Sequence, residues 1–400
     1  MQKGNRKNAM KFIVMLGIVS LFSDITYEGA RSVTGPFLEL LGASASVVGF
    51  VAGFGEFVGY GLRLLTGYFA DRTARYWLFT GIGYAINLLA VPLLALAGNW
   101  QIAAMLVVME RLGKAVRTPA KDVMLSHATS EVGRGWGFAI HEAMDQIGAV
   151  AGPLIVSAAV FVKGNFRSGF AILLLPAVLA LVTLLVARIN FPQPHELEET
   201  SESNEQSSGN MKLPRLFWLY SLFIALTVAG FIHFQLISFH LEKQGVISEA
   251  YIPVLFSIAM GVDALAALLA GKIYDRVGIA SLLAVPVLTA VIPFLVFKTS
   301  YPLVLLGIVL WGIIMGIQET IMKASIADMV STKRRGTAFG IFNTAFGLSW
   351  FIGSAASGRL YDISVTYIKI FVTLTQAAAL FFFIILYLRE KSFISPRTRL

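Results

Sequence analysis

The sequence contains no cysteine, and only 14% of its 400 residues are charged. The absence of cysteine excludes disulfide bonds, thiolate metal ligands and cysteine nucleophiles. A soluble domain usually carries about a quarter charged residues. This chain, which is 56% hydrophobic, therefore has too few charged side chains to solvate a globular surface. The composition predicts a membrane protein.

Acidic residues are also scarce, since 23 Asp and Glu stand against 32 Lys and Arg. Basic cytoplasmic loops and anionic lipid explain such an excess in a membrane protein, so no nucleic-acid partner is expected. The apolar runs are long and continuous, which excludes an outer-membrane barrel. The sequence has no phosphate-binding loop of the Walker type and no Ser/His/Asp arrangement, so we do not expect an enzyme.

Long apolar runs mark the predicted transmembrane helices. Each crossing needs roughly 20 apolar residues, so the chain is long enough for about twelve crossings. The first helix contains 12–22 and should remain uncleaved, because Asp24 and Glu28 stand where a signal peptide would end in small residues. The other runs lie near 46–69, 77–97, 100–120, 135–162, 168–188, 215–241, 250–273, 279–298, 302–327, 336–360 and 366–388.

The composition changes abruptly between the sixth run and the seventh. Residues 191–213 are acidic, rich in serine and nearly devoid of apolar side chains, so burial cannot order them. They predict a flexible cytoplasmic linker between an N-terminal six-helix bundle, 1–190, and a C-terminal six-helix bundle, 214–400. Basic residues gather in alternate loops, which places both termini in the cytoplasm.

Two short motifs occur in both halves, about 200 residues apart. Residues 67–72 (GYFADR) end the second run, and 271–276 (GKIYDR) end the eighth. Residues 134–138 (RGWGF) open the fifth run, and 335–339 (RGTAF) open the eleventh. Such pairs indicate an internal duplication and predict two bundles related by pseudo-symmetry.

With these motifs the sequence resembles the major facilitator superfamily of secondary transporters over essentially its whole length. Residues 67–75 resemble the family's loop motif between helices 2 and 3, although Ala74 stands where a second glycine is usual and Tyr76 where a second basic residue is usual. The resemblance implies that this loop helps to close the cytoplasmic gate. The gating residues that it implies are Gly67, Asp71, Arg72, Arg75, Asp275 and Arg276.

The fifth run contains Gly148-x-x-x-Gly152-Pro153, which resembles the helix-5 motif of the superfamily, often associated with antiporters. Two glycines one turn apart let helices touch backbone to backbone, and a proline removes a donor and bends the helix. The segment is therefore a candidate pivot. Simple glycine-mediated packing is the alternative interpretation.

The fourth run is the most highly charged. Glu110, Lys114 and Arg117 share one helical face, and Arg111 lies beside them. Charges that face lipid cost at least a few kcal/mol each, so we expect this helix to turn them into a polar interior. In the family resemblance, Arg111 is the nearest match to a helix-4 arginine implicated in proton handling.

Other ionisable residues are expected at similar depth, given about 1.5 Å of rise per residue. They form either a coupling or substrate site or a fully paired structural network. A desolvated acid among them could load and release a proton. The candidate coupling or substrate residues are Asp24, Glu28, Glu56, Glu110, Arg111, Lys114, Glu142, Asp145, Asp263 and Glu319. No metal site is predicted, because His141, His233 and His240 lack ligand spacing.

The sequence therefore favours a multi-pass transporter of the plasma membrane, which in bacteria is the inner membrane. It would export a small solute in exchange for protons by alternating access, without a cofactor and as a monomer, with the proton gradient as its energy source. A symporter or facilitator for an organic anion is an alternative suggested by the basic fourth helix. A divalent-metal exporter, and a non-transporting receptor or enzyme on the same fold, are further alternatives.

Overall fold

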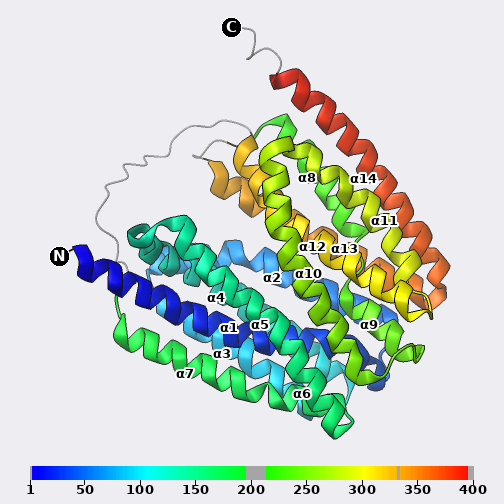
Figure 1. Ribbon diagram of the computed structural model, residues 1–400, viewed down its shortest axis with the longest axis horizontal. Helices are drawn as coiled ribbons and strands as arrows, with labels where there is room; N and C mark the ends of the chain where they lie inside the picture. The colour runs from blue at the N-terminus through cyan, green and yellow to red at the C-terminus, as the bar shows by residue number, and fades with distance from the viewer. Residues whose placement is uncertain (1, 195–212, 331–333, 395–400) are drawn as a thin grey trace. The chain divides into compact units, whose positions relative to one another are not determined.

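The computed structural model describes residues 2–194, 213–330 and 334–394 (Figure 1). Within these ranges the chain forms helices joined by short connections, and they contain no strand. The predicted linker over 191–213 falls mostly on 195–212, outside the described residues, so its flexibility stays a prediction.

Six spans precede the linker. α2 follows α1 after four residues, and a short helix, η1, extends α3. The sixth span is divided between α6 and α7. The helices are α1 (Gln2–Leu40), α2 (Ala45–Thr73), α3 (Tyr76–Leu93), η1 (Leu94–Leu96), α4 (Trp100–Val132), α5 (Arg134–Lys163), α6 (Phe166–Ile172) and α7 (Leu174–Asn190).

Six further spans follow the linker. The first of them is interrupted at 230–233, and short 3-10 helices, η3 and η4, flank the second. The elements are α8 (Arg215–Ala229), α9 (Phe234–Lys243), η3 (Glu249–Tyr251), α10 (Ile252–Val277), η4 (Gly278–Leu283), α11 (Ala284–Val296), α12 (Tyr301–Met329), α13 (Arg335–Ile363) and α14 (Val365–Ile394). The prediction of an all-α membrane protein with about twelve spans is confirmed.

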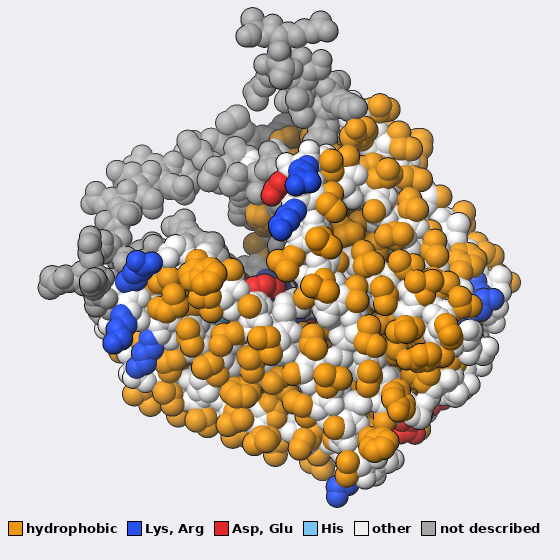
Figure 2. Space-filling view, in the orientation of Figure 1, with side chains coloured by type: hydrophobic (Ala, Val, Ile, Leu, Met, Phe, Trp, Pro, Cys, Tyr) orange, Lys and Arg blue, Asp and Glu red, His pale blue; other side chains and the backbone are white. Residues whose placement is uncertain are grey.

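Nine segments of the described chain are long and apolar enough to cross a membrane, judged by length and composition. α4 is not among them, because four charged residues lie within its first eighteen positions. On the face shown in Figure 2, apolar side chains cover most of the surface. Large apolar side chains such as Leu175 and Ile189 on α7 are exposed, as expected of helices that face lipid.

The chain divides into two compact units, as far as the structure describes them. Unit 1 contains Met1–Gly42, Val58–Glu205 and Ser248–Ser257, and unit 2 contains Ala43–Phe57, Gln206–Ile247 and Ile258–Leu400. The start of α2 thus belongs to unit 2, and the start of α10 to unit 1. The simpler division into 1–190 and 214–400 stays a prediction.

In unit 1, α1 packs against α4, α5 and α7, and α3 packs against α4 (Figure 1). Glycines allow the closest of these contacts. A Cβ atom at Gly152 would lie 2.4 Å from the carbonyl oxygen of Ile25, and one at Gly113 would lie 2.6 Å from the carbonyl oxygen of Gly83. Because real Cβ atoms do not approach so closely, α1 is held against α5, and α3 against α4, nearly backbone to backbone.

In unit 2, α8 packs against α13 and α14, and α11 against α12 and α14. The interruption at 230–233 frees backbone groups, which side chains satisfy. Trp311 Nε1 donates to the carbonyl oxygen of Ile232 at 2.8 Å, and Gln376 Nε2 donates to that of Thr227 at 2.9 Å. Irregular backbone at membrane depth requires such internal partners.

Candidate functional site

The structure brings together six of the ten predicted coupling or substrate residues, all in unit 1. Asp24, Glu28, Glu110 and Arg111 are buried, whereas Lys114 and Asp145 are half-buried. Their electrostatic interactions link α1, α4 and α5. We call them, with their partners, the charged cluster: Asp24, Tyr27, Glu28, Arg31, Glu110, Arg111, Lys114, Arg117, Lys121, His141 and Asp145.

We do not include the other four predicted residues in the charged cluster. Glu56 and Asp263 are buried and Glu319 is exposed, but all three belong to unit 2. Glu142 is in unit 1, on α5, where it is exposed and accepts a long hydrogen bond from Gln146 at 3.5 Å. Their assignment to a coupling or substrate site stays a prediction.

Helical spacing explains how α1 and α4 form the cluster. Asp24, Glu28 and Arg31 follow one another at intervals of four and three residues along α1, and so share a face. On α4 the same spacing places Glu110, Lys114, Arg117 and Lys121 in one stripe. These two polar stripes meet inside unit 1, which keeps the charges away from lipid.

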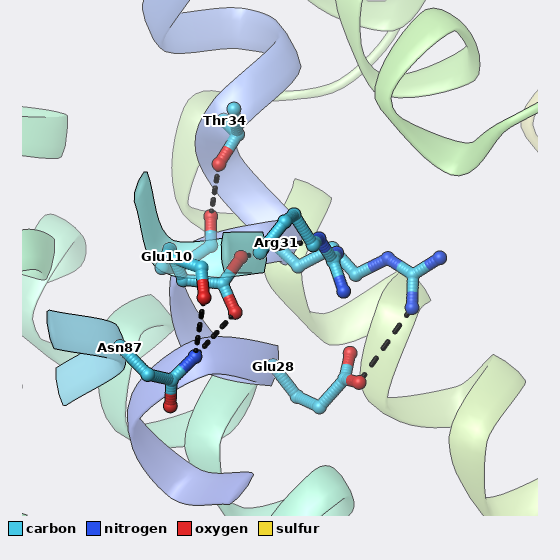
Figure 3. A network of polar contacts seen from close by, with 7 residues as sticks. Glu28, Arg31, Thr34, Asn87 and Glu110 are labelled. Carbon is cyan, nitrogen blue, oxygen red and sulfur yellow. Dashed lines mark hydrogen bonds and ion pairs between the residues drawn. The ribbon is translucent and has the colours of Figure 1, made fainter. Parts of the chain in front are cut away.

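Glu110 is fully engaged in a network near the C-terminal half of α1 (Figure 3). Asn87 on α3 donates from Nδ2 to both the carbonyl oxygen and Oε1 of Glu110, at 2.9 and 2.7 Å. Arg111 Nε lies 3.1 Å from Glu110 Oε2. The figure also shows the ion pair between Arg31 and Glu28, whose atoms are 3.6 Å apart. A carboxylate with this many partners is suited to holding α3 and α4 together.

His141 on α5 connects the opposite end of the cluster. Its Nε2 lies 3.0 Å from Ser20 Oγ and 3.4 Å from Lys121 Nζ, and its Nδ1 lies 3.3 Å from Asp145 Oδ2. The ammonium of Lys121 can only donate, so Nε2 accepts and the Nδ1 proton is directed at Asp145. Lys121 also lies 3.7 Å from the carboxylate of Asp122.

The middle of the cluster contains Asp24, Tyr27, Lys114 and Arg117. Lys114 Nζ lies 4.0 Å from the ring centroid of Tyr27, and Arg117 Cζ lies 4.2 Å from that of Tyr84. The Asp24 carboxylate has no ion-pair or hydrogen-bond partner among the described residues, although Lys114, Arg117, Glu28 and Asp145 all act on it electrostatically. Asp24 thus differs from Glu28 and Glu110, each of which has an arginine at ion-pair distance.

The helix-5 motif packs against α1 beside Asp24. A Cβ atom at Gly148 would lie 2.8 Å from the Cβ of Asp24, and one at Gly152 would meet the backbone at Ile25. Pro153 is buried within α5. The motif therefore sets the distance between Asp24 and α5, whereas its role as a pivot stays a prediction.

The predicted gating motif lies at the end of α2, where Asp71, Arg72 and Arg75 are exposed. Tyr76 donates from its hydroxyl to Asp71 Oδ1 at 3.2 Å. Ala74 has a φ of +52°, a conformation that favours glycine. Beyond the repeated motif in unit 2, Asp275 and Arg276 are also exposed, and Gly278 has a φ of +61°. The turn explains why glycine is usual where this chain has Ala74.

Sequence reasoning missed Tyr27 and Asn87 and did not select Arg117, Lys121 or His141. Asn87 offered one signal, since it is the one Asn, Gln or charged residue between Tyr76 and Leu93. Tyr27 offered none, because its part in the site depends on a lysine from another helix. Among the described residues, no group of three or more His, Asp or Glu side chains could hold a metal ion.

A multi-span helical bundle with ionisable side chains inside it defines the class of this protein, an integral membrane protein with a polar interior. A family model described as Major Facilitator Superfamily matches residues 16–354 and 238–399. The chain belongs to the major facilitator superfamily, a family of transporters, and the predicted family is confirmed.

The chain is 42% identical over 376 residues to an uncharacterized protein of Mycobacterium tuberculosis, which covers 93% of this chain and 92% of that protein. It is 27% identical to an uncharacterized MFS-type transporter of Methanocaldococcus jannaschii, covering 91% and 92%. A shorter match, 32% identical over 146 residues, is to the multidrug resistance protein MdtH of Photorhabdus laumondii and covers 36% and 34%. The nucleoside transporter NupG has the same fold, with a TM-score of 0.73 at 14% identity over 94% of this chain and 99% of NupG.

Proposed function

We propose that the chain is a proton-coupled secondary transporter that moves a small solute across the plasma membrane by alternating access. The main support for this proposal is that the Asp24 carboxylate is buried and has no ion-pair partner among the described residues. Intramembrane ionisable groups that are not paired structurally mark ion or substrate pathways. We therefore assign Asp24 as the residue that binds and releases the transported proton.

The surroundings of Asp24 support this role. Gain of a proton by Asp24 changes the charge that Lys114 and Arg117 experience, and so biases the conformational equilibrium of the transporter. Ser20, one turn earlier on α1, together with His141 and Lys121 provides hydrogen-bonding groups on the side of Asp24 toward the N-terminal end of α1. These groups offer a route for the proton to the cytoplasm.

Efflux by exchange with protons is the first version of this function. The helix-5 motif supports it, as does the partial match to a protein named for multidrug resistance. Exchange requires that the binding of solute and the binding of a proton disfavour each other, which competition for one group achieves. A cationic or neutral solute that binds Asp24 in its charged form meets this requirement.

Co-transport or facilitated transport of an organic anion is the second version, and a specific observation favours it. Lys114 and Arg117 have no carboxylate at ion-pair distance among the described residues. They are therefore available to an anionic solute, whose charge is opposite to that of the proton.

Flux in proteoliposomes that contain the purified full chain tests the proposal. Solutes are first selected by thermal-shift screening, and their movement is then followed with and without an imposed pH gradient. We expect an inward proton gradient to drive net solute movement together with proton flux reported by an internal pH dye. Solute exchange that ignores the gradient, with no proton flux, would contradict proton coupling.

A further inference from the structure

The cations of the charged cluster differ in how they are neutralised. Arg31 lies 3.6 Å from Glu28, Arg111 lies 3.1 Å from Glu110, and Lys121 lies 3.7 Å from Asp122. Lys114 and Arg117, in the middle of the cluster, have no such carboxylate among the described residues. Two cations thus share one region of the interior without an ion pair.

Aromatic rings take the place of carboxylates around these two cations. Lys114 Nζ lies 4.0 Å from the ring centroid of Tyr27, and Arg117 Cζ lies 5.9 Å from the same centroid and 4.2 Å from that of Tyr84. Because both cations approach Tyr27, they lie on a common side of α4, three residues apart. Lys114 and Arg117, with Tyr27 beside them, form what we call the cation pair.

The cation pair is poorly compensated. Arg117 is only 3% exposed, and its Nε is buried without a hydrogen-bond partner among the described residues. The attraction of a cation to an aromatic face is weaker than the cost of a charged side chain within a bilayer that nothing neutralises. Among the described residues, the fold therefore places no carboxylate at ion-pair distance from either cation of the pair.

We propose that the cation pair binds the carboxylate or other oxyanion group of an organic anion, and that this anion is the transported solute. Arginine presents a planar set of donors that matches an oxyanion, and lysine adds a mobile point charge. Lys114 is half-buried as a residue, and its Nζ lies 4.0 Å from the ring centroid of Tyr27, with no carboxylate at ion-pair distance among the described residues. That this anion is the transported solute rests on the second version of the proposed function.

Asp24 has a defined part in this site. When no solute is bound, the ionised carboxylate of Asp24 attracts both Lys114 and Arg117. Asp145 on α5 and Glu28 on α1 also face this region and add negative charge. A bound anion would be repelled by ionised Asp24, and protonation of Asp24 removes that repulsion. Anion and proton therefore strengthen each other's binding, so the two cross the membrane together.

Isothermal titration of the purified full chain with benzoate, and separately with inorganic phosphate, tests the site. The primary variant is Lys114→Gln, because Lys114 is half-buried and its replacement leaves the core intact. We expect benzoate to bind the wild type and its affinity to fall at least about tenfold in Lys114→Gln. Lys114→Arg keeps the charge and should retain most of the affinity, which a merely structural role would not predict.

Arg63→Gln provides the matched control. Arg63 lies on α2 in unit 1 with its Cζ 4.6 Å from the ring centroid of Tyr60, so it also forms a cation–aromatic contact but lies outside the charged cluster. Its replacement should leave benzoate binding unchanged. An equal loss of affinity in Arg63→Gln and Lys114→Gln overturns the proposal, as does a wild type that binds neither probe. Binding of phosphate but not benzoate would overturn the assignment to an organic anion.

Asp24→Asn separates this inference from proton coupling. We expect the variant to bind benzoate several-fold more tightly than the wild type at neutral pH, and without the wild type's gain in affinity on acidification. Weaker binding in Asp24→Asn would overturn the role of Asp24 as the competing carboxylate. If benzoate binding depends on Lys114 while flux ignores the pH gradient, the anion site stands and the proposed coupling fails.

Discussion

The interiors of the two units differ in chemistry although the units carry the same loop motif. Unit 1 buries a cluster of charges from α1, α4 and α5, whereas the described part of unit 2 buries a stack of aromatic rings together with Glu56 and Asp263. Phe231 stacks on Trp311 with centroids 5.4 Å apart, and His233 stacks on Trp350 at 4.8 Å. The motifs at 67–72 and 271–276 share Gly, Asp and Arg at matching positions. Among the described residues, the cluster of ionisable side chains on α1, α4 and α5 belongs to unit 1, and the aromatic stack belongs to unit 2.

One feature of the charged interior nevertheless has a counterpart in unit 2. Asp24 lies against Gly148, and Asp263 on α10 lies against Gly316 on α12, where an added Cβ would be 2.9 Å from its Oδ1. Both aspartates are buried, and Lys114 and Arg117 act electrostatically on Asp24.

The largest effect is expected from neutralising the two aspartates separately. Asp24→Asn should abolish proton-coupled flux in proteoliposomes, because the amide cannot carry a proton, while expression and thermal stability are retained. Asp263→Asn should leave the coupling of protons to solute intact. Coupled flux at the wild-type rate in Asp24→Asn would remove that residue from the mechanism, and loss of coupling in both variants would show that the units share the task.

Adding a methyl group to the two facing glycines is the next test. Gly148→Ala and Gly316→Ala each force a helix away from its neighbour, and overpacking of this kind costs about 1–3 kcal/mol. Both variants should therefore melt at lower temperature. Gly148→Ala alone should also reduce coupled flux, since it displaces Asp24 from α5. Equal effects of the two variants on flux would mean that packing, and not the position of Asp24, limits transport.

A smaller effect concerns how the starts of α2 and α10 are anchored. Within unit 2, Asp362 in the last turn of α13 accepts hydrogen bonds from the backbone nitrogens of Ala45 and Ser46, at 3.1 and 2.9 Å, and from the Ser46 hydroxyl. Within unit 1, the hydroxyls of Ser157 and Ser257 join α5 to η3 and α10, at 2.7 and 2.8 Å. A charged cap thus fixes the start of α2, and neutral hydroxyls fix the start of α10.

Only the charged anchor should depend on pH. Partial burial acts to raise the pKa of Asp362, but the hydrogen bonds from Ser46 and Ala45 outweigh it and lower the pKa below its usual value. Because the folded-state pKa is lowered, this stabilisation is complete at neutral pH and is lost as the pH falls through the lowered value. Asp362→Asn keeps an acceptor oxygen but loses the charge at the start of α2, so it should destabilise by about 0.3–1 kcal/mol at neutral pH and converge with the wild type in acid.

Thermal melting of Asp362→Asn and Ser257→Ala across pH checks this contrast. Ser257→Ala should lower the melting temperature by an amount that does not change with pH, since no charge is involved. A pH-independent difference between the wild type and Asp362→Asn would show that the carboxylate charge contributes nothing to the cap.

Much of the architecture could be predicted from the sequence, because long apolar runs and the length of a membrane crossing determine where spans begin and end. The interruption at 230–233 could not be predicted. It depends on a hydrogen bond from Trp311, which lies about 80 residues away in sequence. The family could be predicted from the motif at 67–75, whose residues lie close together in the chain.

The candidate site could be predicted only in part, because spacing along one helix shows which residues share a face but not what the next helix brings to it. The stripe from Glu110 to Arg117 was expected, and it lies inside unit 1. The structure engages Glu110 with Asn87 and Arg111, and places Lys114 against Tyr27, neither of which spacing could show. Glu142 and Glu319 are exposed. Neighbouring residues on a helix point in different directions, so each of these can be exposed beside a buried neighbour, such as His141 or Gln318.

The smallest effect is expected from exchanging the residues at the two repeated turns. Asp275 follows Asp71 by 204 positions, and Gly278 follows Ala74 by the same interval. Their φ values, +61° and +52°, are nearly equal, so both turns use the left-handed conformation with a different residue. Gly278→Ala should destabilise by about 1 kcal/mol, because a Cβ is strained there. Ala74→Gly removes the strain of the Cβ and should stabilise the fold. The gain should be smaller than the loss in Gly278→Ala, because glycine loses more backbone entropy on folding. Thermal melting of both variants checks this, and destabilisation by Ala74→Gly would mean that the two turns are not equivalent.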